Sequence, residues 1–135
     1  MADNIFKVEI ITPDRVFFQG EADFLEFNTQ AGEIGVYKNH IPVTTVLAPG
    51  VVTIHKGDEI QEAAVHAGFA EILGDKVTLL AEIAEWRDEI DLTRAEEAKR
   101  RAEERLAEKS EKLDVMRAEL ALRKALVRID LADRK

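Results

Sequence analysis

Two unlike halves of the chain meet at the stretch Glu85-Trp86-Arg87-Asp88-Glu89-Ile90-Asp91-Leu92-Thr93-Arg94-Ala95. Before this stretch, glycine, proline and β-branched residues recur and apolar residues alternate with polar ones. After it, neither glycine nor proline occurs. The stretch also carries signals for the start of a helix, because Asp91 and Thr93 are both favourable N-cap residues and Thr93 with Glu96 has the spacing of a capping box. A change of fold class is therefore predicted here.

The N-terminal half, residues 1–86, has the pattern of a small antiparallel β domain. Phe6, Val8 and Ile10 alternate with polar residues, which predicts a strand with one buried face. Turn signals separate the later strands, with Pro49-Gly50 as a strong example. Short strands at near-regular spacing favour a sandwich or flattened barrel and make a parallel sheet unexpected.

Several later strands are expected as separate short segments. Residues 43–48 and 51–55 flank the turn signal at Pro49-Gly50. Residues 60–65 and 69–73 are predicted as two further strands. About eighty residues of this kind can bury one modest core.

The C-terminal half, residues 87–135, has a helical pattern. Leu92, Ala95, Ala98, Ala102 and Leu106 form a stripe rich in alanine, which allows close approach to a neighbouring helix. A second stripe follows a polar interruption, and it comprises Leu113, Met116, Leu120, Val127 and Leu131. The pattern predicts an antiparallel helical hairpin with a turn near Ser110, in which both stripes are buried. One continuous helix is the alternative, because no helix breaker stands at the turn.

Charge and composition limit the class of protein. The formal net charge is −8, and the segment up to Arg87 carries all of it, with 6 Lys and Arg against 14 Asp and Glu; the remainder has 13 of each. An acidic N-terminal half argues against nucleic-acid binding. The absence of cysteine excludes disulfides and thiolate metal sites. No apolar run is long enough to span a bilayer and the start lacks a signal-peptide pattern, so membrane association is expected only through a partner.

No catalytic constellation stands out, and neither catalytic residues nor a metal site are predicted. His40, His55 and His66 are scattered, without the helical pairing of zinc ligands, so structural roles are expected for them. Ser110 is the single serine and lies in a predicted turn, so a serine nucleophile is not expected. Neither a phosphate-binding P-loop nor a dinucleotide fingerprint is present.

Three basic residues of the helical half form the one candidate binding cluster. Arg94 opens the first helix, and Lys124 and Arg128 lie one turn apart on the second. If the hairpin folds back, the three cations converge and could bind phosphates. By composition alone, ordinary salt bridging to Glu or Asp is the favoured explanation.

The order and spacing of several motifs resemble the epsilon subunit of bacterial rotary F-type ATP synthases over nearly the whole length. The motifs are Val8-Glu9-Ile10-Ile11-Thr12-Pro13-Asp14, Gly32-Glu33-Ile34-Gly35, His40-Ile41-Pro42, Leu47-Ala48-Pro49-Gly50, Ala67-Gly68-Phe69-Ala70-Glu71-Ile72, Val77-Thr78-Leu79-Leu80-Ala81-Glu82 and Arg117-Ala118-Glu119-Leu120-Ala121-Leu122. The resemblance implies a mainly β N-terminal sandwich of about ten strands followed by a C-terminal antiparallel α-helical hairpin.

The resemblance also implies a function and a set of partners. It implies a non-catalytic central-stalk subunit that couples proton- or sodium-driven rotation to ATP synthesis and binds the gamma subunit and the c-ring. The hairpin would permit turnover when packed on the sandwich. When extended into the catalytic alpha and beta subunits it would inhibit ATP hydrolysis, with its basic second helix facing an acidic segment of beta. The implied location is peripheral, on the cytoplasmic face of the bacterial cell membrane. The segment Gly32–Pro42, with His40 and Ile41 exposed, is predicted as an intersubunit surface.

Some members of that family bind ATP on the packed hairpin through a motif matched here by Ile90-Asp91-Leu92-Thr93-Arg94-Ala95. The resemblance extends the site to Glu85 before the motif and to Lys124 and Arg128 on the second helix. Glu85, Asp91, Arg94, Ala95, Lys124 and Arg128 are therefore the predicted ATP-binding residues. Lys124 departs from the family's arginine, and a lysine cannot form the planar bidentate contact, so weak regulatory binding is expected. No required cofactor is predicted.

Two alternative functions are compatible with the residues alone. One is a β-sandwich adaptor whose coiled-coil hairpin grips client proteins. The other is a stand-alone ATP-sensing module. Co-purification with a gamma-like stalk subunit distinguishes the synthase subunit from both.

Overall fold

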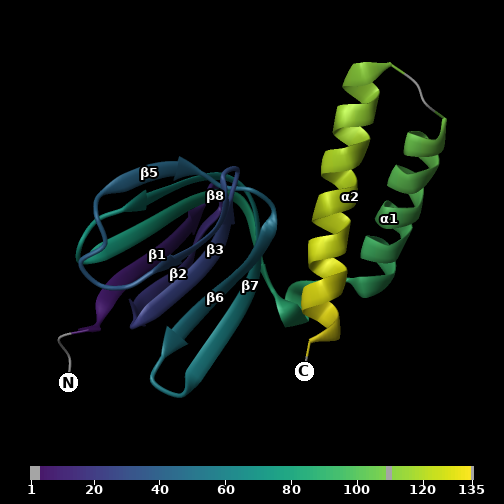
Figure 1. Ribbon diagram of the computed structural model, residues 1–135. Helices are drawn as coiled ribbons and strands as arrows, with labels where there is room; N and C mark the ends of the chain where they lie inside the picture. The colour runs from purple at the N-terminus through teal and green to yellow at the C-terminus, as the bar shows by residue number, and fades with distance from the viewer. Residues whose placement is uncertain (1–3, 109–110, 135) are drawn as a thin grey trace. The chain divides into compact units, whose positions relative to one another are not determined.

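The computed structural model describes residues 4–108 and 111–134, without the side chain of Leu113. The chain forms two compact units, Met1–Glu85 and Trp86–Lys135. The first is the β unit and the second is the helical unit (Figure 1).

The β unit contains eight strands within the described residues (Figure 1). The strands are β1 (Phe6–Thr12), β2 (Arg15–Ala22), β3 (Phe24–Thr29), β4 (Gly32–Val36), β5 (Val43–Val46), β6 (Gly50–Lys56), β7 (Glu59–Ile72) and β8 (Lys76–Trp86). Their order is β2-β1-β8-β7-β6-β3-β4, and β5 pairs with β7. The sheet folds over on itself as a sandwich, which confirms the predicted fold class.

One strand pair departs from the antiparallel prediction. β1 and β8 pair in parallel, with Val8 opposite Val77 and Ile10 opposite Leu79. The pairs β1–β2, β3–β4, β3–β6, β5–β7 and β6–β7 are antiparallel. The parallel pair needs no crossover helix, because the intervening six strands carry the chain from β1 round to β8.

Alternation along the strands builds the core as predicted. Phe6, Val8 and Ile10 of β1 are at most 2% exposed. On the parallel neighbour, Val77 and Leu79 are fully buried. Facing positions of the other strands complete the interior, among them Leu25, Phe27, Val36, Val52, Ile54, Val65 and Ile72.

The described residues form eight strands rather than about ten, and one strand of this difference arises because β7 is one long strand. The expected separate strands at 60–65 and 69–73 are joined: the first part pairs with β6 and the second with β5. Ala67 and Gly68 lie between the two parts with positive φ angles of 58° and 114°. This local distortion redirects the strand from one partner to the other without ending it.

The helical unit consists of α1 (Leu92–Ala107) and α2 (Lys112–Asp133), which pack against each other. The short 3₁₀ turn η2 (Arg87–Glu89) precedes them. Two helices confirm the predicted hairpin and exclude the continuous helix. The turn predicted near Ser110 lies outside the described residues.

Candidate functional site

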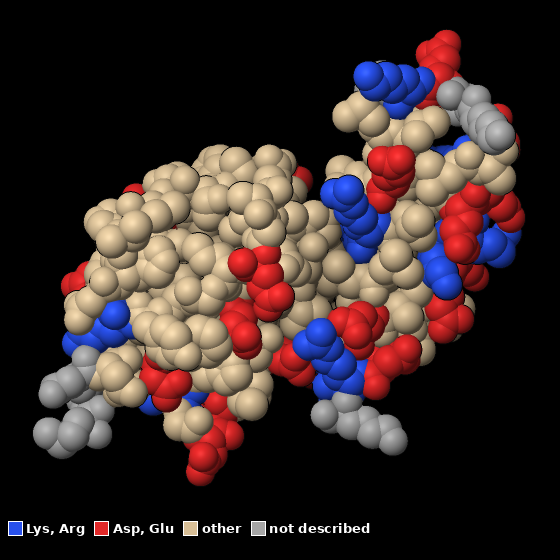
Figure 2. Space-filling view, in the orientation of Figure 1, with Lys and Arg blue, Asp and Glu red and all other residues tan. Residues whose placement is uncertain are grey.

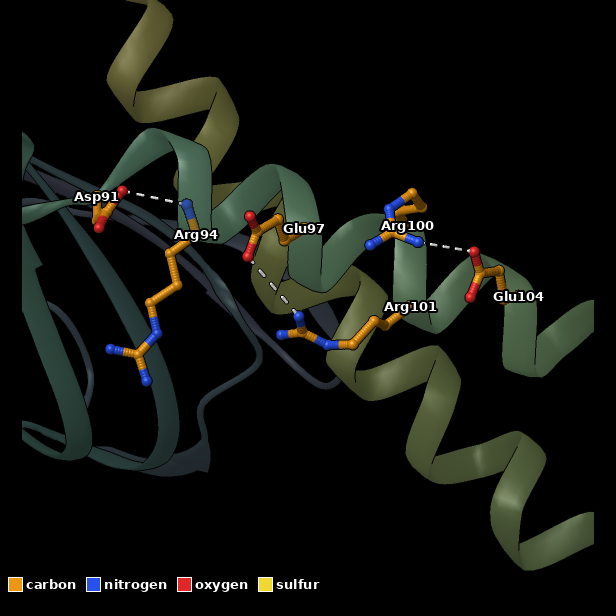
Figure 3. Close-up of polar contacts among 6 residues, drawn as sticks. All are labelled: Asp91, Arg94, Glu97, Arg100, Arg101 and Glu104. Atoms are coloured by element: carbon orange, nitrogen blue, oxygen red, sulfur yellow. Dashed lines mark hydrogen bonds and ion pairs between the residues drawn. The ribbon is translucent and has the colours of Figure 1, made fainter.

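Asp91 begins α1, which corrects one expectation about the helix start. The Asp91 Oδ1 atom accepts a hydrogen bond of 3.1 Å from the backbone N–H of Arg94 (Figure 3). Asp91 is therefore the N-cap, and Thr93 lies inside the helix, so the predicted capping box of Thr93 and Glu96 is wrong. The earlier cap wins because its carboxylate is already in reach of the free N–H groups and suits the positive end of the helix dipole.

A contact that the sequence did not reveal closes one end of the hairpin. The Arg87 Nε–H donates to the backbone carbonyl of Leu131 over 3.1 Å. A cation at the last carbonyls of a helix is favourable because those carbonyls lack helical partners. This bond holds the end of α2 at the start of the helical unit, and Leu131 itself is fully buried.

Alanines line the contact between the helices. Ala95 and Ala102 of α1 and Ala118 and Ala125 of α2 are each at most 3% exposed. The alanine stripe predicted on α1 is confirmed at two of its positions. Small side chains let the two helix backbones approach closely. Because a large side chain on either helix would push the backbones apart, small residues are needed on both.

The stripe predicted on α2 is wrong in its larger members. Met116 is 58% exposed and Leu120 is 43% exposed, whereas Leu131 is buried as expected. Leu126, which lies beside the predicted stripe, is 44% exposed. Because alanines occupy the narrow seam, the bulkier apolar residues of α2 project to the outside, where they are available to another surface.

The six predicted ATP-binding residues have different local roles. Asp91 caps α1 through a carboxylate oxygen, and Ala95 packs in the seam. Glu85 belongs to the β unit, where its Oε1 lies 3.7 Å from Nε2 of His66. Arg94, Lys124 and Arg128 would carry the phosphate contacts.

Arg94 is exposed, and Lys124 and Arg128 are half-buried. Figure 3 shows the Arg94 side chain extending away from Asp91 and Glu97. Arg94 lies in the first turn of α1 and Arg128 near the end of α2, at the end of the hairpin that Arg87 closes. Their convergence on one ligand stays a prediction.

Charged residues elsewhere on α1 pair along the helix. Arg100 and Glu104 form an ion pair of 2.9 Å, and Glu97 and Arg101 form one of 4.0 Å (Figure 3). Exposed pairs of this kind contribute about 0.3–0.5 kcal/mol each. Figure 2 shows acidic and basic side chains interleaved over the helices, so the helical surface is mixed in sign.

The segment from Gly32 to Pro42 exposes apolar side chains, as expected for an intersubunit surface. Ile41 is 73% exposed and Tyr37 is 63% exposed. Asn39 has a positive φ of 68° and turns the chain between them. His40 is half-buried rather than exposed, and its Nδ1 lies 2.7 Å from the carbonyl oxygen of Ile41.

A second exposed apolar feature of the β unit was missed from the sequence. Val46 of β5 pairs with Phe69 of β7, and they are 44% and 53% exposed. Leu80 of β8 is 43% exposed, and it faces Phe69 because the β7–β8 hairpin closes between Leu73 and Lys76. We call Val46, Phe69 and Leu80 the apolar stripe. Alternation marks these positions as the outer face, but gives no sign that three apolar residues would line up there.

Neither a metal-binding group nor a membrane-spanning helix is found in the part of the chain that the structure describes. The described histidines are too dispersed for a shared metal ion.

Comparison with known families matches both units. The model for the ATP synthase delta/epsilon chain β-sandwich domain matches residues 5–87, and the model for the long α-helix domain of the same chain matches residues 88–133. The ATP synthase epsilon chain of Caldanaerobacter subterraneus is 42% identical over 98% of this chain and 96% of its own length. That of Alkaliphilus metalliredigens is 45% identical over 96% and 97%.

Solved structures support the fold. A chain of the Euglena gracilis mitochondrial ATP synthase (OSCP/F1/c-ring) matches 96% of this chain and 81% of its own length, with a TM-score of 0.81 and 20% identity. A chain of the Tetrahymena thermophila mitochondrial ATP synthase central stalk and c-ring covers 94% and 92%, with a TM-score of 0.57 and 14% identity. By its two matched domains and its full-length relatives, the chain belongs to the ATP synthase epsilon chain family and is a non-catalytic subunit.

Proposed function

We propose that the chain is a rotor subunit of the central stalk of an F-type ATP synthase. It couples ion-driven rotation to ATP synthesis and restrains ATP hydrolysis through its helical unit. The observation that carries this proposal is the match of both units, in order, to the two domains of the epsilon chain family. The similar Euglena and Tetrahymena chains belong to complexes that contain a c-ring.

The β unit is the part that joins the stalk. Its apolar stripe exposes three large side chains that are costly to leave in water, at about 25 cal/mol per Å² of apolar surface. The gamma subunit is the proposed partner of this stripe. The segment Gly32–Pro42, which exposes Tyr37 and Ile41, is proposed to face the c-ring.

The helical unit is suited to be a mobile brake because its internal packing is thin. Four buried alanine methyl groups contribute roughly 3 kcal/mol, at about 0.8 kcal/mol for each buried carbon. That is small compared with the roughly 100 kcal/mol of gross burial and dispersion energy that a typical domain gathers before its conformational entropy is subtracted. The exposed Met116, Leu120 and Leu126 of α2 offer apolar contacts to the catalytic alpha and beta subunits when the hairpin extends.

A regulatory ATP site is proposed on the packed hairpin. Arg94, Lys124 and Arg128 would bind the phosphates, and Glu85 and Asp91 would face the base or ribose. One Asp91 oxygen already caps α1, so only its remaining acceptor capacity is available to a ligand. No cofactor is needed for the coupling role, and the membrane is reached only through the complex, at its cytoplasmic face.

Co-purification tests the stalk assignment. A tagged chain expressed with the gamma subunit should be recovered as a stable pair, and Phe69→Asp should reduce recovery at least tenfold because it buries an unpaired charge in the contact. Ile41→Asp should retain the gamma subunit and weaken attachment to the c-ring. Recovery of the β unit without gamma under all conditions would instead favour the adaptor or ATP-sensing alternatives. Asp58→Asn, an exposed polar change in the turn between β6 and β7 and outside both proposed surfaces, is the matched control.

A further inference from the structure

The last turn of α2 carries charges of unfavourable sign. The carbonyl end of a helix is the negative end of its dipole and is stabilised by cations. The last turn of α2 contains Asp130 and Asp133 and no basic residue. Asp130 pairs over 2.8 Å with Arg134, which is the C-cap and lies just beyond the helix. The end of α2 is therefore stabilised by cations that lie outside the helix.

Arg87 brings such a cation from a distant part of the helical unit. It lies in η2, and its Nε–H donates over 3.1 Å to the carbonyl oxygen of Leu131, 44 residues further along the chain. The same oxygen accepts the backbone N–H of Arg134 at 3.2 Å, and a carbonyl has lone pairs for both donors. Figure 1 shows the end of α2 beside the turn that follows β8. Arg87 is exposed, so water competes for its guanidinium and the bond is reversible.

The path of the chain does not by itself keep the end of α2 at η2. α2 follows α1 in sequence and begins at Lys112, and its 22 residues span about 33 Å. The packing along this length is thin, because alanines line the seam between the helices. A charge-assisted hydrogen bond at the far end of α2 therefore acts where the packing leaves the helix weakly held.

We propose that Arg87 is a clasp, whose bond to the Leu131 carbonyl fastens the end of α2 to the start of the helical unit and opposes opening of the hairpin. The bond forms only while α2 lies antiparallel to α1, so it stabilises the closed hairpin and not an opened one. The clasp thereby sets how readily the brake extends, a consequence that rests on the proposed function. Loss of the clasp lengthens the time for which the brake is engaged.

Hydrogen exchange of the full-length chain tests the clasp without the other subunits. An isolated helix of this length is marginal in water, so the amides of α2 exchange when it detaches from α1. Arg87→Ala should raise the exchange rates of the amides of residues 127–131 about three- to tenfold, the range expected for one exposed hydrogen bond. Arg87→Lys keeps a cation near the carbonyl and should retain part of the protection. Unchanged amide signals of β1 show that the β unit stays folded.

A second arginine at a helix end is the matched control. Arg105 is exposed in the last turn of α1, so Arg105→Ala removes the same charge from the end of the other helix. It should leave the exchange rates of residues 127–131 unchanged. Equal rates in Arg87→Ala and the unmodified chain, or an equal rise in both alanine variants, would overturn the clasp.

ATP hydrolysis by a reconstituted synthase tests the regulatory consequence. The complex with Arg87→Ala should hydrolyse ATP more slowly than the complex with the unmodified chain, by at least about twofold, because the hairpin opens more often. A chain ending at Glu89, which keeps every described strand, measures the brake itself. If the shortened chain is faster but Arg87→Ala is not slower, the regulatory role of the clasp is wrong. If the shortened chain is no faster, the proposed brake is wrong, and the exchange rates still decide the clasp.

Discussion

Gly68 shows how one residue determines the path of a strand. A Cβ atom at this position would lie 1.9 Å from the carbonyl oxygen of Leu80, and the residue has a φ of 114°. Glycine alone combines this backbone angle with so close an approach. The distortion at Gly68 lets β7 pass from β6 to β5, so the strand count depends on it.

We expect Gly68→Ala to destabilise the β unit by about 2–4 kcal/mol, from backbone strain and the clash with Leu80. Urea unfolding of the full chain measures this. Gly57→Ala is the control, because Gly57 also has a positive φ, 60°, but has no atom within 4 Å of the added Cβ. The control should cost only about 1 kcal/mol. Equal losses in both variants would show that packing at Leu80 is unimportant.

The ion pair of Lys76 with Glu9 links β8 to β1 and makes stability depend on pH. The hydrogen bond and charge of Glu9 raise the pKa of Lys76, and the charges of Glu71 and Asp75 add to the effect. A raised folded-state pKa means that this stabilisation is fully present below the unfolded pKa of about 10.4 and is lost as the pH rises through the folded value.

Glu9→Gln should therefore lower the thermal midpoint at pH 8, and the difference from the unmodified chain should shrink at about pH 11.5. Calorimetry at both pH values measures the difference. Glu33→Gln, at an exposed position, should change neither value. A Glu9→Gln effect that persists unchanged at the higher pH would contradict a role for the lysine charge.

At the scale of elements, the spacing of apolar residues correctly predicted that two helices form. It was less successful in predicting which face of α2 is buried. The alanines of α1 were identified from their spacing, but Met116 and Leu120 of α2 were expected to be buried and are exposed. Hydrophobicity favours the large residues for the seam, whereas close backbone approach requires Ala118 and Ala125. Sequence patterns report hydrophobicity and not the distance between helices.

The local roles of the predicted ATP-binding residues could also be foreseen only in part, because sequence patterns do not report which groups lie close together in the fold. The motif placed Asp91 and Arg94 at the start of α1, where the structure has them. The sequence offered both Asp91 and Thr93 as caps without deciding between them, and it gave no indication that Glu85 lies within ion-pair distance of His66. These roles depend on residues distant in the sequence or on which of two possible caps prevails.

We expect the isolated chain to bind ATP weakly, because Lys124 offers a point charge where a bidentate arginine would add about 1 kcal/mol or more. ATP would favour the packed hairpin only by its difference in affinity between packed and extended forms. Calorimetric titration measures binding, and Lys124→Arg should strengthen it several-fold. Binding left unchanged by Arg94→Ala would place the site elsewhere, and no binding at millimolar ATP would make the motif structural.

At the scale of the whole molecule, the change of pattern at residues 85–95 marked the division between two compact units. The described strands of the β unit end by Trp86, and the buried residues Phe6, Val8 and Ile10 all lie on these strands. A chain ending at Glu89 therefore keeps every described strand. It should fold cooperatively and still join the stalk.

The most direct test of the account is the ATP hydrolysis rate of a reconstituted ATP synthase that carries either the full chain or the chain ending at Glu89. Both should assemble, because the apolar stripe and the segment Gly32–Pro42 remain. The shortened chain should give faster hydrolysis, because the helical unit that restrains it is gone. Equal hydrolysis rates in two fully assembled complexes would contradict the proposal that the hairpin is a brake.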